Sequence, residues 1–143
     1  MSDRSVVIGI DPGQSTGVAI FVDGVLTELC TLSPVLIAAL INPSVSRVIF
    51  EDSRLQSHIW AAPKASRAAG MKIARNVGQI DAWCSLIVAL CEAAKVDCHG
   101  ISPKSKGAKL NAAQFEAMTG WAGKSNQHER DAACVAWMYR RAA

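Results

Sequence analysis

Short apolar runs separated by turn-forming residues dominate the first third of the chain. The β-branched run SVVIGI at 5–10 predicts a strand that stops at Asp11, where the turn formers PGQSTG begin. A second run, VAIFV at 18–22, is joined to a third at 25–31 by an Asp-Gly pair, which is a strong signal for a hairpin turn. These patterns predict three strands in an antiparallel meander.

Helical and strand-like patterns alternate over the rest of the chain. A short helix, opened by Ser33 and Pro34 and ending near Ile41, is followed by a strand at 47–50 (RVIF). Apolar residues three and four positions apart predict a long helix from Pro63 or Lys64 to about Ala94, with a stripe made of Ile73, Val77, Ile80, Trp83, Ile87 and Leu90. The last predicted elements are a strand at 97–101, a helix at 110–118 capped by Asn111, and a helix from about 126 to 141.

The order β-β-β-α-β-α-β-α-α predicts an α/β fold, in which three antiparallel strands continue into parallel ones to give a mixed five-stranded sheet flanked by helices. A chain of 143 residues that is 50% hydrophobic and 19% charged fits a single domain over 1–143 with a packed core. No apolar run approaches the roughly 20 residues of a membrane-spanning helix, and the N-terminus shows no targeting pattern. We therefore expect a cytoplasmic protein with no membrane partner.

The five cysteines include no C-x-x-C pair, which argues against a zinc ribbon. Their odd number also argues against a disulfide framework. Cys84 and Cys91 lie seven residues apart on one face of the predicted long helix. We expect these thiols to be small buried apolar groups in a reducing compartment.

Basic residues are concentrated in two segments that contain no acid, although the net charge is only +3. Residues 53–80 carry five of them, namely Arg54, Lys64, Arg67, Lys72 and Arg75, and residues 98–115 carry Lys104, Lys106 and Lys109. Such segregation favours a polyanionic partner. Two ordinary solvated faces are the alternative interpretation.

Two carboxylates follow predicted strands, Asp11 after SVVIGI and Glu51 after RVIF. His128 and Asp131 are three residues apart near the start of the final helix, so their side chains share one face. These four groups converge if that helix packs beside the first and fourth strands. Taken singly, each has an ordinary role: a turn former, a strand-end ion-pair partner, a surface histidine and a helix-dipole partner.

A converged cluster of carboxylates repels itself unless a cation neutralises it. Mg²⁺ prefers oxygen ligands, and Mn²⁺ also accepts imidazole. Two such ions, about 4 Å apart, activate water and stabilise the leaving oxygen when a phosphodiester is hydrolysed. The pattern therefore favours a site for Mg²⁺ or Mn²⁺, with two ions, that hydrolyses nucleic acid.

Three stretches resemble the RuvC-type Holliday junction resolvases of the RNase H-like superfamily. VVIGIDPGQSTGVAIF resembles the family's opening strands, and RVIFED resembles its fourth strand with the catalytic glutamate. HERDAACVAW is similar to the C-terminal helix, and DCHGISPKSKGAK to the fifth strand with its lysines. The resemblance runs from Val6 to Trp137, and the ending GKSNQHERDAA looks most like phage-encoded relatives.

The resemblance implies an RNase H-like fold and a homodimer that cuts two strands of a four-way DNA junction. It implies metal-binding and catalytic roles for Asp11, Glu51 and Asp131, with His128 at a fourth position that is aspartate in many relatives. The family's long helix is its dimer interface, whereas the stripe here is equally compatible with packing entirely on the sheet. DNA contacts are expected from the basic residues of both segments, and Trp60 is the candidate wedge at the junction centre.

Other classes of function remain open from the residues. Actin-like ATPases also begin with a strand and a D-x-G-x-x-x-G loop, but they need two such domains and a longer chain. A DNA-binding scaffold without catalysis has no need of three carboxylates in these positions. A nuclease for other branched or RNA-containing substrates shares the same motifs.

Overall fold

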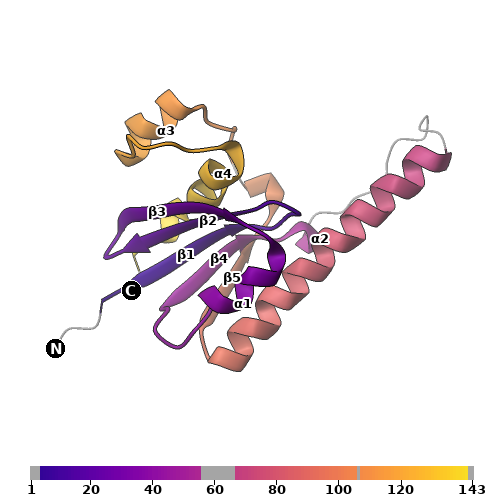
Figure 1. Ribbon diagram of the computed structural model, residues 1–143, viewed down its shortest axis with the longest axis horizontal. Coiled ribbons are helices and arrows are strands. Elements are labelled where there is room, and N and C mark those ends of the chain that lie inside the picture. The colour runs from indigo at the N-terminus through magenta and orange to yellow at the C-terminus, as the bar shows by residue number, and fades with distance from the viewer. Residues whose placement is uncertain (1–3, 56–66, 106, 142–143) are drawn as a thin grey trace.

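Five strands form one mixed sheet in the order β3-β2-β1-β4-β5 (Figure 1). The strands are β1 Val6–Asp11, β2 Thr16–Val22, β3 Val25–Leu32, β4 Arg47–Glu51 and β5 Asp97–Ile101. β1, β2 and β3 pair antiparallel, whereas β4 lies parallel to both β1 and β5. This computed structural model describes residues 4–55, 67–105 and 107–141, and it confirms the predicted mixed sheet.

The turn between β2 and β3 shows why the meander forms. Asp23 and Gly24 have φ values of 51° and 83°, the paired left-handed conformation of a type I′ hairpin turn. The twist of that turn matches the twist of the two strands that it joins. The predicted Asp-Gly hairpin is therefore confirmed.

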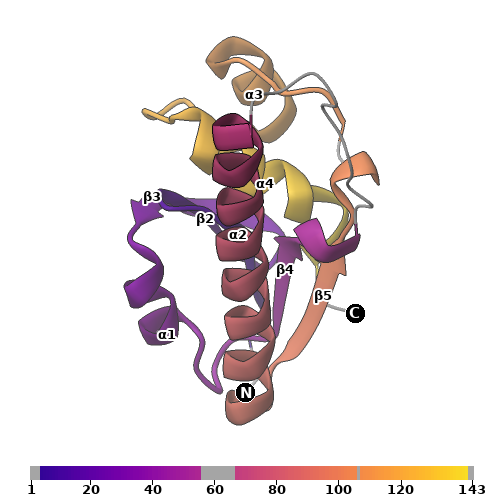
Figure 2. The same ribbon diagram turned by 90° about the vertical axis from the view of Figure 1, so that its right-hand side faces the viewer.

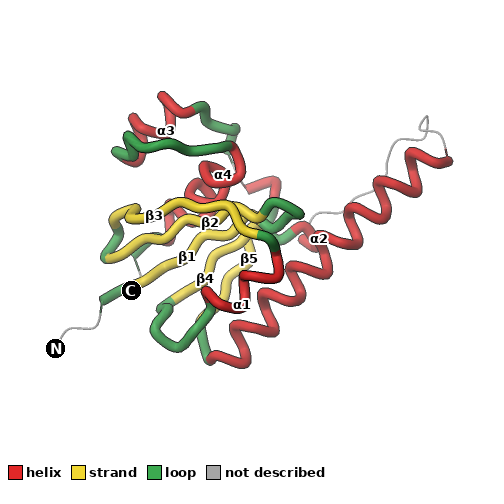
Figure 3. Tube along the Cα trace, in the orientation of Figure 1, coloured by secondary structure: helices red, strands yellow, loops and turns green. Residues whose placement is uncertain are grey.

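Helices connect and cover the strands as the sequence predicted, with differences at their ends. They are η1 Pro34–Leu36, α1 Ile37–Leu40, η2 Ser53–Leu55, α2 Arg67–Ala94, η3 Pro103–Ser105, α3 Ala112–Thr119, α4 Gln127–Ala136 and η4 Trp137–Tyr139 (Figure 3). The helix expected at 33–41 is a 3₁₀ turn followed by a short α-helical segment. The final helix was expected to reach 141, but its α-helical part ends at Ala136 and changes to 3₁₀. The expected start of α2 at Pro63 or Lys64 lies outside the described residues.

Strand alternation divides the interior into two cores on opposite faces of the sheet. Ile10 and Phe50 belong to the face covered by α1 and α2, together with Cys84, Ile87 and Cys91 of α2. The other face buries Val7 and Ile49 beneath α4. Figure 2 shows α2 running along one side of the sheet with α4 on the other. Cys84 and Cys91 are buried, as the sequence predicted.

Only the C-terminal half of α2 packs on the sheet. Its buried residues begin at Cys84, whereas residues 67–76 are all exposed and the helix projects beyond the sheet (Figure 1). The predicted apolar stripe therefore does not pack entirely on the sheet, because the sheet is shorter than the helix. Among the described helices, α2 alone is long and apolar enough to cross a membrane; length and composition by themselves are weak evidence for that.

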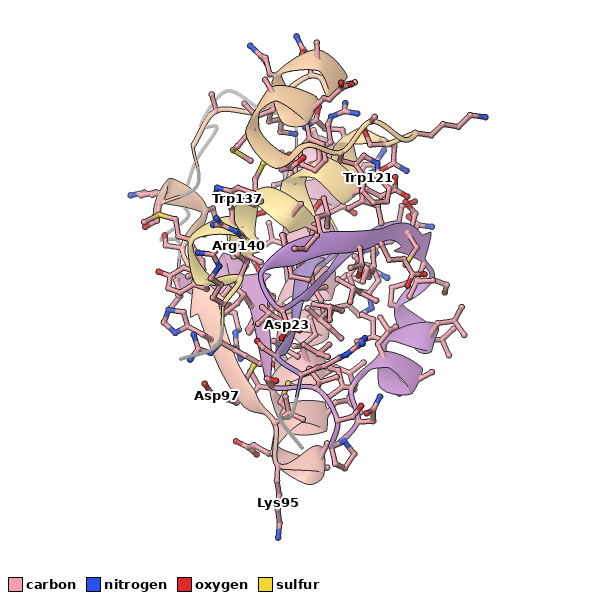
Figure 4. All side chains as sticks on the ribbon, turned by 90° about the vertical axis from the view of Figure 1, so that its left-hand side faces the viewer. Asp23, Lys95, Asp97, Trp121, Trp137 and Arg140 are labelled. Atoms are coloured by element: carbon pink, nitrogen blue, oxygen red, sulfur yellow. The ribbon has the colours of Figure 1, made fainter. Side chains whose placement is uncertain are left out.

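The segment after α4 packs against both β2 and β5, where Tyr139 lies 5.3 Å from the ring of His99. The rings of Phe21 and Trp137 lie 6.0 Å apart, and the guanidinium of Arg140 stacks 3.8 Å above the Trp137 ring (Figure 4). These contacts hold the end of α4 and η4 in place beyond Ala136.

Candidate active site

Asp11 and Glu51 end two neighbouring parallel strands and point to the same face. The last register pair of β1 and β4 is Ile10 with Phe50, whose side chains both face α2. Because successive side chains alternate, Asp11 and Glu51 face α4 from strands about 4.8 Å apart. The sheet therefore brings together two carboxylates that are distant in the sequence.

Two glycines let α4 approach the sheet closely. A Cβ atom on Gly17 would lie 2.0 Å from the carbonyl oxygen of His128, and one on Gly9 would lie 2.3 Å from that of Ala132. Both distances are far below van der Waals contact, so no other residue fits at either position without movement of α4. This close approach is what places His128 and Asp131 beside the end of β1.

His128 contacts Asp11 directly. Its Nδ1 atom lies 3.5 Å from Oδ2 of Asp11, with the Asp11 side chain 16% exposed and the His128 side chain 53% exposed. The imidazole therefore reaches the β1 carboxylate while retaining access to solvent. This pair confirms that the start of α4 lies at the end of β1, as the convergence hypothesis required.

Asp131 is buried on the same helix, and both of its carboxylate oxygens have partners. Oδ1 accepts a hydrogen bond of 2.8 Å from Nε2 of Gln127, and Oδ2 lies 3.8 Å from Nζ of Lys109. The exposed fraction of Asp131 is 5%. Burying a carboxylate costs free energy unless it is hydrogen-bonded or paired, and here an amide and an ammonium group compensate it. Gln127 carries no distinguishing signal in the sequence, because an i, i+4 side-chain pair at a helix start is a common pattern.

A capping box and a bond to β3 hold the start of α4. Asn126 accepts from the backbone N–H of Glu129, and the Glu129 carboxylate accepts from the backbone N–H of Asn126. Thr31 at the end of β3 donates to Oε2 of Glu129 at 3.0 Å and accepts from Asn126 at 2.7 Å. Glu129, which lies between the candidate residues His128 and Asp131 in the sequence, thus serves to anchor the helix that carries them.

The four candidate ligands are suited to a divalent cation by their chemistry. Three carboxylates and one imidazole suit Mg²⁺ or Mn²⁺: Asp11 contacts His128, Asp131 follows on the same helix, and Glu51 ends the strand beside β1. Within the described parts of the chain, no three acidic, histidine or cysteine side chains are close enough together to form a ready-made metal site. Asp11, Glu51, His128 and Asp131 are the residues that would hold such a cation.

Asp52, next to Glu51, is buried and paired with Arg54. Arg54 donates from Nε to Oδ1 and from Nη2 to Oδ2 of Asp52, both at 2.9 Å. The hydrogen bonds from Arg54 hold the pKa of Asp52 below its usual range. Arg54 was predicted to contact DNA, but two of its donor groups are committed to this carboxylate.

The other predicted DNA contacts lie in three places. Arg67, Lys72 and Arg75 are on the exposed first half of α2. Lys104 is on η3, directly after β5, whose last residue Ile101 pairs with Glu51. Lys109 is 66% exposed beside Asp131. Trp60, Lys64 and Lys106 lie outside the described residues.

No protein-family model and no curated protein sequence matches this chain. Among solved structures, the chain is similar to "T. thermophilus RuvC in complex with Holliday junction substrate", with a TM-score of 0.60, 16% identity, and coverage of 93% of this chain and 90% of that one. It is similar to "Thermus thermophilus RuvC structure" at the same TM-score and identity, over 92% of this chain and 91% of that one.

The fold that these structures share is the RNase H-like α/β fold, with a mixed five-stranded sheet flanked by helices. Within that class, the arrangement of this chain is similar to that of the two RuvC structures. A likeness at 16% identity establishes the fold and leaves the function to be argued from the residues.

Proposed function

We propose that the protein is a divalent-metal-dependent endodeoxyribonuclease that resolves four-way DNA junctions by paired, symmetric hydrolysis of phosphodiester bonds. The observation that carries the proposal is the meeting of Asp11 and His128 at 3.5 Å, with Asp131 on the same helix and Glu51 on the neighbouring strand. Nothing in folding demands this set of groups at the ends of β1 and β4 and in the first turns of α4. The fold shared with a RuvC bound to a Holliday junction supports the choice of substrate.

In this proposal Asp11, Glu51, His128 and Asp131 would hold two Mg²⁺ or Mn²⁺ ions. The ions supply Lewis acidity toward the phosphodiester and lower the pKa of bound water. The neutral imidazole of His128, which is half-exposed, would either bind an ion or, where it does not, transfer a proton. Lys109 screens Asp131 in the metal-free protein, and in the complex its ammonium group is free to contact a phosphate.

The basic residues supply most of the affinity for DNA in this proposal. Lys104 and Lys109 border the site, and the first half of α2 adds further positive charge. The complete set of predicted DNA contacts is Arg54, Lys64, Arg67, Lys72, Arg75, Lys104, Lys106 and Lys109, with Trp60 as the wedge. Binding then weakens steeply with salt, because each neutralised phosphate releases counterions. Backbone contacts of this kind read the shape of a branched substrate more than its base sequence.

We further propose a homodimer formed through the projecting half of α2. The stripe that packs on the sheet at Cys84 continues to Ile73, which is 47% exposed, and Met71 on the same half is 53% exposed. Two such subunits supply the two active sites that paired cuts require. Ile73→Asp is expected to give monomers in light scattering, whereas Val35→Asp, at an exposed apolar residue on η1, leaves the dimer intact. A monomeric wild type contradicts this arrangement.

One cleavage assay tests the function. Labelled four-way junction, linear duplex and RNA–DNA hybrid are incubated with the protein, with and without Mg²⁺ or Mn²⁺. Paired symmetric nicks confined to the junction and dependent on metal are the expected result. Cleavage of the hybrid or of other substrates instead supports the second candidate, an RNase H-like nuclease of different specificity. Binding of DNA without any cleavage supports a non-catalytic relative and overturns the enzyme proposal.

Asp11→Asn is the matched variant for this assay. It should abolish cleavage while junction binding stays the same or becomes tighter, because a negative charge is removed beside the phosphate path. Asp23→Asn, the same substitution at the exposed β2–β3 turn, serves as the control and should cleave like the wild type. Loss of junction binding in Asp11→Asn shows instead that Asp11 is structural.

A further inference from the structure

Glu51 lies at the point where the pairing of β4 with its neighbouring strands ends. The register of β4 with β1 ends one residue earlier, at Phe50, and Glu51 forms the last pair of β4 with β5, opposite Ile101. A metal ligand must be held within a fraction of an ångström of its binding position. The structure therefore needs further contacts at this strand end.

Such contacts come from the beginning of the packed half of α2. The thiol of Cys84 donates to the backbone carbonyl of Glu51 at 3.7 Å, and Cys84 is fully buried. Ser53, two residues after Glu51, donates to Oδ1 of Asp81 at 2.6 Å.

Asp52 and Arg54 complete the connection on both sides. The backbone N–H of Asp52 donates to the carbonyl of Ile101 at 2.8 Å, which extends the contact with β5 beyond Glu51. Arg54, held on Asp52 by two hydrogen bonds, donates from Nη1 to Ser85 of α2 at 3.2 Å. Gly100 of β5 leaves the space for Asp52, because a Cβ there would lie 2.9 Å from its Oδ2 atom.

We propose that these contacts form a strand-end network that positions Glu51 for metal binding. Its members are Asp52, Ser53 and Arg54, which follow β4, and Asp81, Cys84 and Ser85 of α2. This inference rests on the proposed function. The members of this strand-end network are positioning residues, since their hydrogen bonds join the end of β4 to α2. The strand-end network also connects Glu51, the proposed metal ligand, with α2, the helix whose other half projects from the sheet.

The test measures metal affinity without relying on cleavage. Binding of Mn²⁺ is followed by isothermal titration calorimetry, with thermal unfolding of the metal-free protein in parallel. Asp81→Ala and Ser53→Ala are each expected to weaken Mn²⁺ binding by about tenfold, the usual effect of removing a group that orients a ligand. The double variant should be no weaker than either single one, because the same hydrogen bond is lost in all three.

Two controls separate positioning from general stability. Asp81→Asn keeps an acceptor oxygen for Ser53 and should bind Mn²⁺ within about twofold of the wild type. Glu92→Ala removes an exposed acid from the same helix, outside the strand-end network, and should not change the affinity for Mn²⁺.

The outcomes also distinguish this inference from the function on which it rests. If the wild type binds Mn²⁺ and Asp81→Ala binds it equally well, with or without a lower melting temperature, the strand-end network is only structural and the inference is overturned. If the wild type itself binds no Mn²⁺, the proposed metal site fails and the inference fails with it. Loss of affinity in Asp81→Ala with recovery in Asp81→Asn supports the inference.

Discussion

Gly17→Ala tests whether the close approach of α4 to β2 builds the candidate site. The added methyl group would lie 2.0 Å from the carbonyl oxygen of His128, 2.3 Å from its carbonyl carbon and 3.0 Å from the backbone nitrogen of Glu129. These are backbone atoms at the first turn of a helix anchored by its capping box, so no side-chain rotation relieves the clash. The start of α4 must move away from β2 by about 1 Å.

The expected cost follows from that displacement. Overpacking a close contact typically costs about 1–3 kcal/mol, and a backbone clash of this depth belongs at the upper end. For a chain of this size, about 3 kcal/mol lowers the melting temperature by roughly 6–12 °C. Because His128 and Asp131 move with the helix, cleavage under the proposed function should fall by about 100-fold.

Differential scanning calorimetry and the junction cleavage assay measure both effects. Gly13→Ala is the matched control, since it lies in the adjoining β1–β2 loop and its nearest new contact would be an ordinary 3.5 Å. If Gly17→Ala has the same melting temperature and the same activity as Gly13→Ala, the close approach of α4 to β2 is refuted, because α4 then cannot lie as close to β2 as described.

Three further results are expected. Asp52→Asn should lower the free energy of unfolding at pH 7, because the carboxyl paired with Arg54 has a depressed pKa in the folded protein. The loss relative to the wild type should shrink as the pH falls below about 4. A loss that stays constant in urea titrations down to pH 3 contradicts this expectation. Asn126→Ala removes the cap of α4 and should cost about 1 kcal/mol in the same titrations, whereas an unchanged midpoint means that the bond between Thr31 and Glu129 anchors the helix alone. Gly78→Ala, at an open position in α2, should instead stabilise the protein by about 0.5–1 kcal/mol, and a loss of stability there shows that something packs on that face.

Local sequence patterns were enough to predict the elements and the fold class. The β-branched runs and the Asp-Gly turn encode the β1–β3 meander through short-range preferences, and each predicted strand lies within two residues of an observed one at both ends. Periodicity likewise placed Cys84 on a buried face. The residues at the strand ends, Asp11 and Glu51, followed from the same patterns, because a strand boundary is a local property.

Only the tertiary structure decided how these elements meet. Periodicity tells which face of α2 is apolar, but the length of the sheet determines that Ile73 lies beyond it and is exposed. The contact of His128 with Asp11 requires that Gly17 have no side chain, and nothing local marks that glycine as different from those in the loops.

The groups that hold the site are invisible in the sequence for a related reason. Ser53 and Asp81 are 28 positions apart, and Thr31 and Glu129 are 98 apart, so no spacing rule connects them. Arg54 was predicted from its charge to face DNA, yet the buried carboxylate of Asp52 holds two of its donors. The sequence by itself determined which groups are available at the strand ends, and packing decided which of them touch, because hydrogen-bond partners across a fold depend on three-dimensional distance.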